Sequence, residues 1–193
     1  MKSSAASKIA PNLSRNDWID GALNQLARGG IDTVLVAPLA RELGVTKGSF
    51  YWHFKDRQAL LDAMLERWHR TDTEIMSEVR NVRGDAAARL RLIIELSVKQ
   101  IGGRLETALR DWGRREPKAR AAIEQIDRRR LVELRELFGA FCVDPQEVEA
   151  RSWLLYSMLT GVHLIAAPPA GIDRQALLLR CLEVLAPSAS PDD

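Results

Sequence analysis

Apolar residues recur at helical spacing along nearly the whole chain, and no segment shows the strict alternation of a half-buried β-strand. Glycine and proline divide this pattern into segments. Gly29–Gly30 end the first one, and Pro117 and Pro145 stand where a first helical turn accepts proline. We therefore predict an all-α fold of about nine helices. The predicted helices cover residues 15–28, 36–43, 47–53, 56–80, 85–101, 105–112, 117–140, 145–167 and 173–185.

The distribution of charge says more than its total. The chain has 193 residues, which suit one or two small domains, and a net charge of +2. Residues 1–55 hold seven basic and four acidic side chains, a balance of +3, so the remainder carries −1. A modestly basic N-terminal part on a near-neutral body is typical of a nucleic-acid-binding module. A chance distribution stays open as the alternative.

Several features predict a cytoplasmic protein without membrane contact. Cys142 and Cys181 lie in apolar helical surroundings and form no disulfide framework, which fits a reducing compartment. The N-terminal stretch MKSSAASKIAPNLS lacks the apolar run of a signal peptide. Residues 152–172 contain no Asp, Glu, Lys or Arg, but Pro168–Pro169 leave only about 15 of them for a helix, too few to cross a bilayer. We interpret this segment as a buried helix.

The segment LARELGVTKGSFYWHFK, within residues 36–55, has the pattern of a helix-turn-helix. Ala40 provides a small side chain where the two helices approach, and Gly44 can adopt the left-handed conformation that the turn needs. Phe50 and Phe54 are four residues apart, so they fall on one face of the second helix and are predicted to anchor it in the core.

The other side chains of that second helix are predicted to face outward and contact DNA. A recognition helix offers its N-terminal residues to base edges and its other polar residues to phosphates. Lys47 can reach a guanine or a phosphate, Ser49 is small enough for a base edge, and Tyr51 offers both a ring and a hydroxyl. The alternative is a helical hairpin whose aromatic residues are all core. The predicted DNA-binding residues are Thr46, also the expected N-cap, Lys47, Ser49, Tyr51, Trp52, His53 and Lys55.

The segment VTKGSFYWHFKDRQALLDAML resembles the signature of the tetracycline-repressor (TetR) family of bacterial transcription regulators. In that family a Gly-Val turn leads into a recognition helix ending in Tyr-x-His-Phe, then a charged residue and a long fourth helix. Gly44–Val45, Tyr51–Phe54 and Ala59–Leu61 fill those places here. Leu35–Val36 depart from the family, which more often opens the second helix with a Ser or Thr that caps it and touches phosphate.

The resemblance implies two domains and a homodimer. It covers about residues 13–73 in detail, which implies a DNA-binding domain there and a ligand-binding and dimerisation domain over residues 74–187. The two C-terminal helices would form the dimer interface, and their apolar composition supports this independently because a body this small cannot bury both without a partner. The alternative is that both are internal. A two-fold dimer would match a palindromic operator in double-stranded DNA.

The resemblance also implies a ligand pocket between the fourth and eighth helices. An apolar, aromatic-lined pocket would suit a small hydrophobic or planar effector. Aromatic residues at helical spacing can equally be core. The candidate lining residues are Met64, Trp68, Leu96, Arg110, Trp112, Trp153, Tyr156 and His163.

Other functions find less support in the sequence. No Cys/His pair has metal-ligand spacing, and no GxSxG, P-loop or strand-linked GxGxxG motif occurs, so we predict no enzyme activity, metal or cofactor. The run Arg128–Arg130 is interpreted as a solvated face, with acidic residues at helical spacing, and not as a second DNA-binding patch. The predicted function is a regulator, a repressor that an effector releases from its operator. The alternative is a sequence-independent architectural protein, which would want a larger basic excess.

Overall fold

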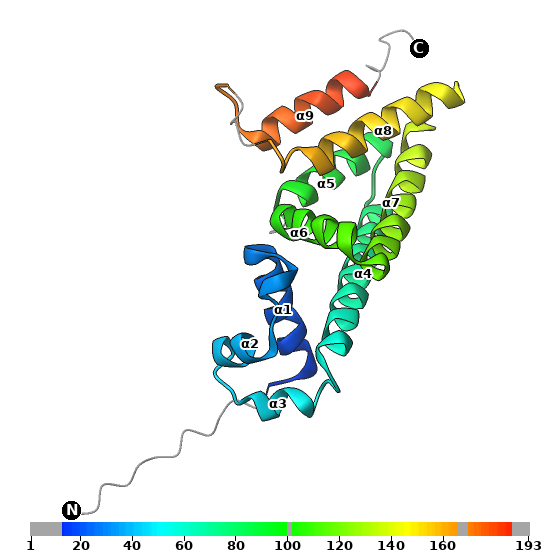
Figure 1. Cartoon of the computed structure of the whole chain (residues 1–193). Helices are drawn as coiled ribbons and strands as arrows, with labels where there is room; N and C mark the ends of the chain where they lie inside the picture. The colour runs from blue at the N-terminus through cyan, green and yellow to red at the C-terminus, as the bar shows by residue number, and fades with distance from the viewer. Residues whose placement is uncertain (1–12, 100–101, 166–169, 187–193) are drawn as a thin grey trace, which may run out of the picture.

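The computed structural model describes residues 13–99, 102–165 and 170–186, and the regular elements in these residues are all helical (Figure 1). The all-α prediction is confirmed. The elements are α1 (Arg15–Gly29), the short 3-10 helix η1 (Ile31–Thr33), α2 (Val36–Glu42), α3 (Lys47–Tyr51), α4 (Arg57–Asn81), α5 (Ala86–Lys99), α6 (Gly102–Arg115), α7 (Pro117–Phe138), α8 (Pro145–Gly161) and α9 (Arg174–Leu185).

Local chemistry explains where the first helices begin and end. Ser14 and Asp17 form a reciprocal capping box at the start of α1, with the Asp17 N–H donating to Ser14 Oγ at 3.3 Å and the Ser14 N–H donating to Asp17 Oδ2 at 2.7 Å. Gly30 ends α1 with a φ of 77°, in the region that disfavours side chains. Asp56 caps α4 by accepting the Ala59 N–H at 2.8 Å.

Three predicted boundaries need correction. α3 ends at Tyr51, two residues early. α8 ends at Gly161, before the predicted residue 167, because the chain tightens into a turn in which the Leu164 N–H donates to the Gly161 carbonyl at 2.9 Å; residues 166–169 lie outside the described part. α6 begins at Gly102, before the predicted start at residue 105, so Gly103 lies inside the helix. A Cβ on Gly103 would lie 2.2 Å from the His163 ring, so close approach explains the glycine.

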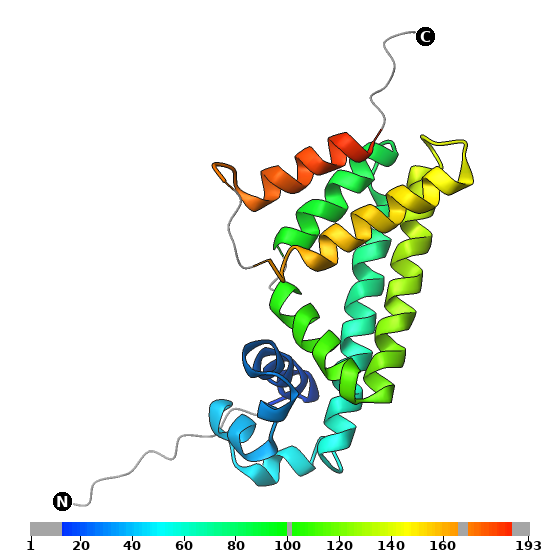
Figure 2. The same cartoon turned by 45° about the horizontal axis from the view of Figure 1, so that its top comes forward.

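The helices form two packed ends joined by long helices, as Figures 1 and 2 show. α1–α3 and the start of α4 make one end, and α8 and α9 lie side by side at the other, with α4 and α7 running between them. The predicted domain boundary at residues 73–74 falls inside α4. The first core also takes in Leu109 and Trp112 of α6 and Ile126 of α7, so α6 is packed directly on the N-terminal unit.

The second core lies between α4, α5, α7, α8 and α9 and is mostly aliphatic. Its largest fully buried side chains are those of Phe138, Leu90, Ile94 and Leu155. Among the described helices, none combines the length and the apolar character that crossing a bilayer requires.

Candidate DNA-binding surface and ligand cavity

The turn between α2 and α3 has the geometry that the sequence predicts. Gly44 adopts a φ of 70°, and the Val45 N–H donates to the Ala40 carbonyl at 2.9 Å, closing the turn. Phe50 is fully buried, edge-on to Trp18 at 5.3 Å between ring centroids and stacked on Phe54 at 5.4 Å. The two phenylalanines therefore hold α3 against α1.

The side chains predicted to contact DNA lie around this anchored helix. Tyr51 is 54% exposed and Trp52 is 89% exposed, an unusual placement for large aromatic rings. Ser49 and His53 are half-buried. Thr46 is the N-cap residue of α3, as predicted, but its side chain makes no capping hydrogen bond. The exposed members of the set are Thr46, Lys47, Tyr51, Trp52 and Lys55.

Arg57, the first residue of α4, donates hydrogen bonds to two backbone carbonyls that precede α2. Its Nε donates to the Val34 carbonyl at 2.6 Å and its Nη2 donates to the Ile31 carbonyl at 3.0 Å. These bonds tie the start of α4 to the segment that leads into α2. The sequence offered no signal for them, since an arginine after an N-cap aspartate reads as an ordinary exposed side chain.

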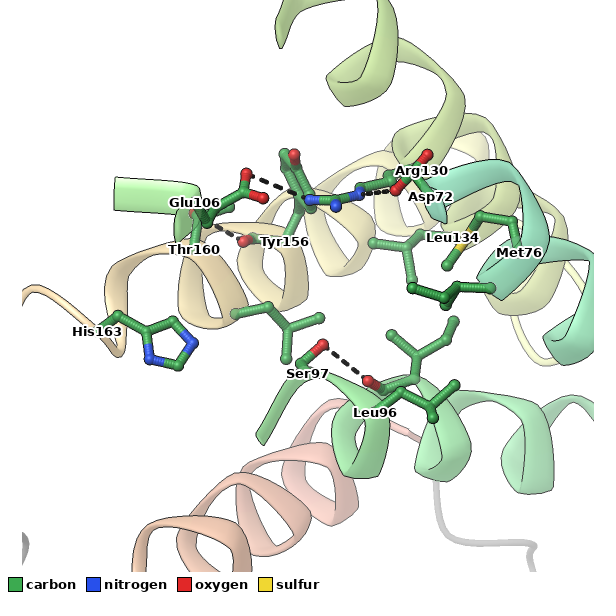
Figure 3. Close-up of a pocket in the computed structure, with 13 residues that line it drawn as sticks. Asp72, Met76, Leu96, Ser97, Glu106, Arg130, Leu134, Tyr156, Thr160 and His163 are labelled. Atoms are coloured by element: carbon green, nitrogen blue, oxygen red, sulfur yellow. Dashed lines mark hydrogen bonds and ion pairs between the residues drawn. The ribbon is translucent and has the colours of Figure 1, made fainter. Parts of the chain in front are cut away.

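A cavity of about 80 Å³ lies in the second half of the molecule between α4, α5, α6, α7 and α8 (Figure 3). Six of the lining side chains are apolar. Asp72, Glu106 and Arg130 lie together along one side of the cavity, which we call the polar wall, whereas Ser97 lies beside Leu96 on the opposite side, as Figure 3 shows. The lining residues are Asp72, Ile75, Met76, Ile93, Leu96, Ser97, Glu106, Arg130, Leu134, Tyr156, Leu159, Thr160 and His163.

The polar wall centres on a buried carboxylate. Asp72 is only 2% exposed, and it accepts hydrogen bonds from Arg129 Nη2 at 2.9 Å and from Arg130 Nε at 2.7 Å. Arg130 also reaches Glu106, with 3.3 Å between Nη1 and Oε1, so its guanidinium bridges two carboxylates, as Figure 3 shows. Charge pairing of this kind is what permits a carboxylate to be buried.

The prediction that the arginine run of α7 forms a solvated face is therefore wrong in part. Arg129 and Arg130 point inward because Asp72 and Glu106, on other helices, compensate their charge. Only Arg128 fits the predicted solvated face, at 3.8 Å from Glu124 one turn earlier.

A second cluster supports the wall from behind. Arg110 donates to Asp127 at 2.8 and 3.1 Å and to Glu106 Oε1 at 2.7 Å. The Tyr156 hydroxyl donates to Asp127 Oδ1 at 2.6 Å and accepts from Arg110 at 3.0 Å. Burial, together with the hydrogen bond to Asp127, raises the pKa of Tyr156 to about 12, so the phenol stays neutral.

His163 closes one end of the cavity. It follows α8, with its ring against Gly103 of α6. Burial lowers the pKa of His163, and the positive charge of Arg174 lowers it further. The imidazole therefore adds no charge to the cavity at neutral pH.

The ligand-binding residues predicted from the sequence separate into three groups. Leu96, Tyr156 and His163 line the cavity, and Arg110 supports its wall. Met64, Trp68 and Trp112 do not; they belong to the first core, because α4 and α6 turn these positions toward α1. The predicted aromatic lining is thus reduced to one tyrosine. Trp153 lies on the surface, 53% exposed, with Nε1 donating to Glu149 at 2.6 Å.

The cavity residues that were missed include Asp72, Glu106 and Arg130. One of them carried a signal. Trp68, Asp72 and Ile75 share a helical face, so an aspartate interrupts an otherwise apolar stripe. A charged residue in such a stripe must be paired or functional.

The outer face of α8 and α9 exposes several large apolar side chains. Trp153 and Leu154 of α8 are 53% and 58% exposed, and Val184 of α9 is 80% exposed. Glu149 accepts the hydrogen bond of the Trp153 indole. It also accepts hydrogen bonds from Arg135, from Nε at 2.5 Å and from Nη2 at 2.8 Å. That hydrogen-bonded ion pair lowers the pKa of Glu149 to about 2. Within the described residues, no group of three or more His, Cys, Asp or Glu side chains could hold a metal ion.

Comparison with known proteins identifies the N-terminal part. Residues 19–64 match the family profile described as "Bacterial regulatory proteins, tetR family". The tetracycline repressor protein class D of Escherichia coli is 44% identical over 52 residues, which are 27% of this chain and 24% of that protein. The match thus spans about a quarter of that relative's length.

Solved structures resemble the fold over nearly the full length. A transcriptional regulator from Rhodococcus sp. Rha1 superposes with a TM-score of 0.70 at 17% identity, over 90% of this chain and 94% of that one. FadR from Bacillus subtilis, solved in complex with stearoyl-CoA, gives a TM-score of 0.65 at 18% identity, over 90% and 98%. At this level of identity the likeness concerns the fold alone.

Proposed function

Since its N-terminal domain places the chain in the TetR family of bacterial regulatory proteins, we propose that the protein is a sequence-specific DNA-binding transcriptional regulator controlled by a small molecule. The observation that carries this proposal is the surface of α3, where Tyr51 and Trp52 are exposed directly beside the buried anchors Phe50 and Phe54. Adjacent aromatic rings exposed to water are unfavourable in free energy, and such a patch marks a surface that binds a partner. The family resemblance inferred from the sequence is confirmed, and the relatives compared above are regulators, not enzymes.

DNA contact is assigned to the set around α3. Lys47 and Tyr51 would reach base edges, while Thr46 and Lys55 would bind phosphates. The free hydroxyl of Thr46 suits this role because no capping bond occupies it. The family more often opens α2 with a Ser or Thr that touches phosphate, and here the exposed apolar residue Leu35 takes that place as the N-cap of α2.

The regulator is proposed to act as a homodimer through the outer faces of α8 and α9. The exposed apolar residues there are more than scattered surface residues, because Trp153 and Leu154 are adjacent on one helix and Val184 lies on the helix packed beside it. A two-fold dimer presents two α3 helices to a palindromic operator.

The cavity is proposed as the effector site, with α6 as the link to DNA binding. Glu106 of α6 forms part of the cavity wall. At the other end of the same helix, Arg115 pairs with Asp32 of η1 at 3.0 Å, and Trp112 is buried in the first core. A ligand that alters the contacts of Glu106 would therefore shift a helix on which the N-terminal unit is packed.

The direct test is selection of random duplexes by the purified protein, followed by sequencing of the bound pool. We expect an enriched palindrome with two equal half-sites. A pool bound without enrichment, at equal affinity for all sequences and matched salt, would favour the architectural alternative and contradict the proposal.

Matched variants locate the contact surface. Lys47→Ala should weaken binding to the selected duplex by about 1–3 kcal/mol, as expected for loss of a base-edge or phosphate contact. Arg128→Ala removes an equally exposed positive charge from α7 and should leave affinity unchanged. Equal losses in the two variants would show that only overall charge matters.

A further inference from the structure

The chemistry of the cavity wall narrows the class of effector, on the premise of the proposed function that this cavity is the effector site. The apolar side presents Ile75, Met76, Leu96 and Leu159. Such a surface takes a hydrocarbon group. The selective part of the site must therefore be the wall that carries Asp72, Glu106 and Arg130.

The polar wall and the second cluster behind it carry equal numbers of positive and negative charges. Three guanidinium groups face three carboxylates in one connected network, and His163, with its lowered pKa, adds nothing at neutral pH. An anion placed at Arg130 would lie against Glu106, and a cation placed at Glu106 would lie against Arg130. Either ion would also lose its hydration on entering a largely apolar cavity, and it would find no opposite charge that is not already paired. The members of the network are Arg110, Arg129, Arg130, Asp72, Glu106 and Asp127.

The hydrogen bonds within the wall leave out one donor group of Arg130 and one acceptor oxygen of Glu106. Arg130 uses Nε for Asp72 and Nη1 for Glu106, and neither bond engages Nη2. Glu106 receives both of its arginines on Oε1, so neither bond engages Oε2. Ser97 and Thr160 donate their hydroxyl protons back to their own helices, at 2.7 and 2.9 Å, and so offer only acceptor lone pairs to the cavity.

We infer that the cavity binds a small neutral amphiphile whose polar end both donates and accepts hydrogen bonds, such as a primary carboxamide, and whose short apolar tail packs on Met76 and Leu96. A carboxamide oxygen can accept from Arg130 while its NH2 group donates to Glu106. The volume of about 80 Å³ is about half that of an engineered cavity that accommodates benzene, so the tail must be about two carbon atoms long.

The test compares three probes of equal length: propanamide, propanoate and propylammonium. The protein is labelled with 13C at the methionine methyl groups and followed by NMR. The Met76 signal, assigned with Met76→Leu, reports the cavity, and Met64, fully buried in the first core, is the internal control. We expect propanamide to shift Met76 with a dissociation constant about tenfold lower than that of either ion, because each ion leaves one wall group unpaired.

A variant tests the reason for this preference. Glu106→Gln removes the negative charge beside Arg130 at nearly the same shape, and we expect it to strengthen propanoate binding about tenfold. Glu124→Gln removes the same charge from the exposed face of α7 and should change nothing.

Three outcomes would overturn the inference: stronger binding of either ion, no shift of Met76 with any probe, or equal responses of the two variants. The DNA selection is independent of these probes. An enriched palindrome with no propanamide binding would refute the ligand class alone, and propanamide binding with no enriched DNA would refute the regulator alone.

Discussion

The two hydrophobic cores of this protein are built differently. The first packs aromatic rings, with Trp18 and Phe50 fully buried and in edge-on contact. The second is mostly aliphatic and surrounds a cavity whose wall contains the buried carboxylate of Asp72. A closely packed core holds a surface in one geometry, whereas a core with a cavity and a charged wall can respond to an occupant. The difference fits the proposed division of roles, in which one end of the molecule holds α3 toward DNA and the other end binds the effector.

The largest effect is expected from breaking the aromatic core. Phe50→Ala should lower the free energy of unfolding by about 3–5 kcal/mol, because a fully buried ring leaves a cavity in a well-packed site. Urea denaturation followed by circular dichroism measures it. Tyr51→Ala, one residue away, should change stability by less than about 1 kcal/mol because this ring is half exposed. A comparable loss in both variants would mean that Tyr51 is a core residue.

Removal of the buried carboxylate tests the second core. Asp72→Ala should lower the free energy of unfolding by about 3 kcal/mol, the lower end for broken buried pairs, because Arg129 still reaches solvent. The matched change Glu124→Ala breaks an exposed pair and should cost no more than about 0.5 kcal/mol. If the two costs agree in urea denaturation, the wall of the cavity does not depend on charge pairing.

The outer face of α8 should respond in assembly and not in folding. Trp153→Ala should weaken the proposed dimer by about 2 kcal/mol, since its indole is held in place by Glu149 and is 53% exposed on the proposed interface. Sedimentation analysis over a dilution series measures this. Val132→Ala, an exposed apolar residue of α7, is the control. An unchanged dissociation constant for Trp153→Ala would move the interface elsewhere.

The smallest effect concerns His163. Its pKa in the folded protein lies below the ordinary 6.5, so the unfolded chain binds the proton more readily. Stability contributed by the neutral ring is complete above pH 6.5 and is lost as the pH falls toward the folded pKa. NMR titration of the imidazole gives that pKa, and His163→Gln should flatten the dependence of stability on pH below 6.5. A titration midpoint at or above 6.5 would contradict the assignment.

The sequence determined the local features of the fold. The capping box of Ser14 and Asp17, the left-handed Gly44 and the buried pair Phe50 and Phe54 are confirmed, because each depends on residues a few positions apart. The same holds for the number and order of the α-helices in the described residues, since helical spacing is a local signal.

Only the tertiary structure decided which faces turn inward in the second half. Met64, Trp68 and Trp112 pack toward α1 and not toward the cavity, while Arg129 and Arg130 turn inward to Asp72. Helical spacing shows which residues share a face, but it does not show what that face meets. An arginine side chain is normally exposed. The burial of Arg130 depends on the carboxylates of Glu106 and Asp72, which lie 24 and 58 positions away along the chain. Charge compensation between distant helices is therefore the part of this protein that its sequence could not reveal alone.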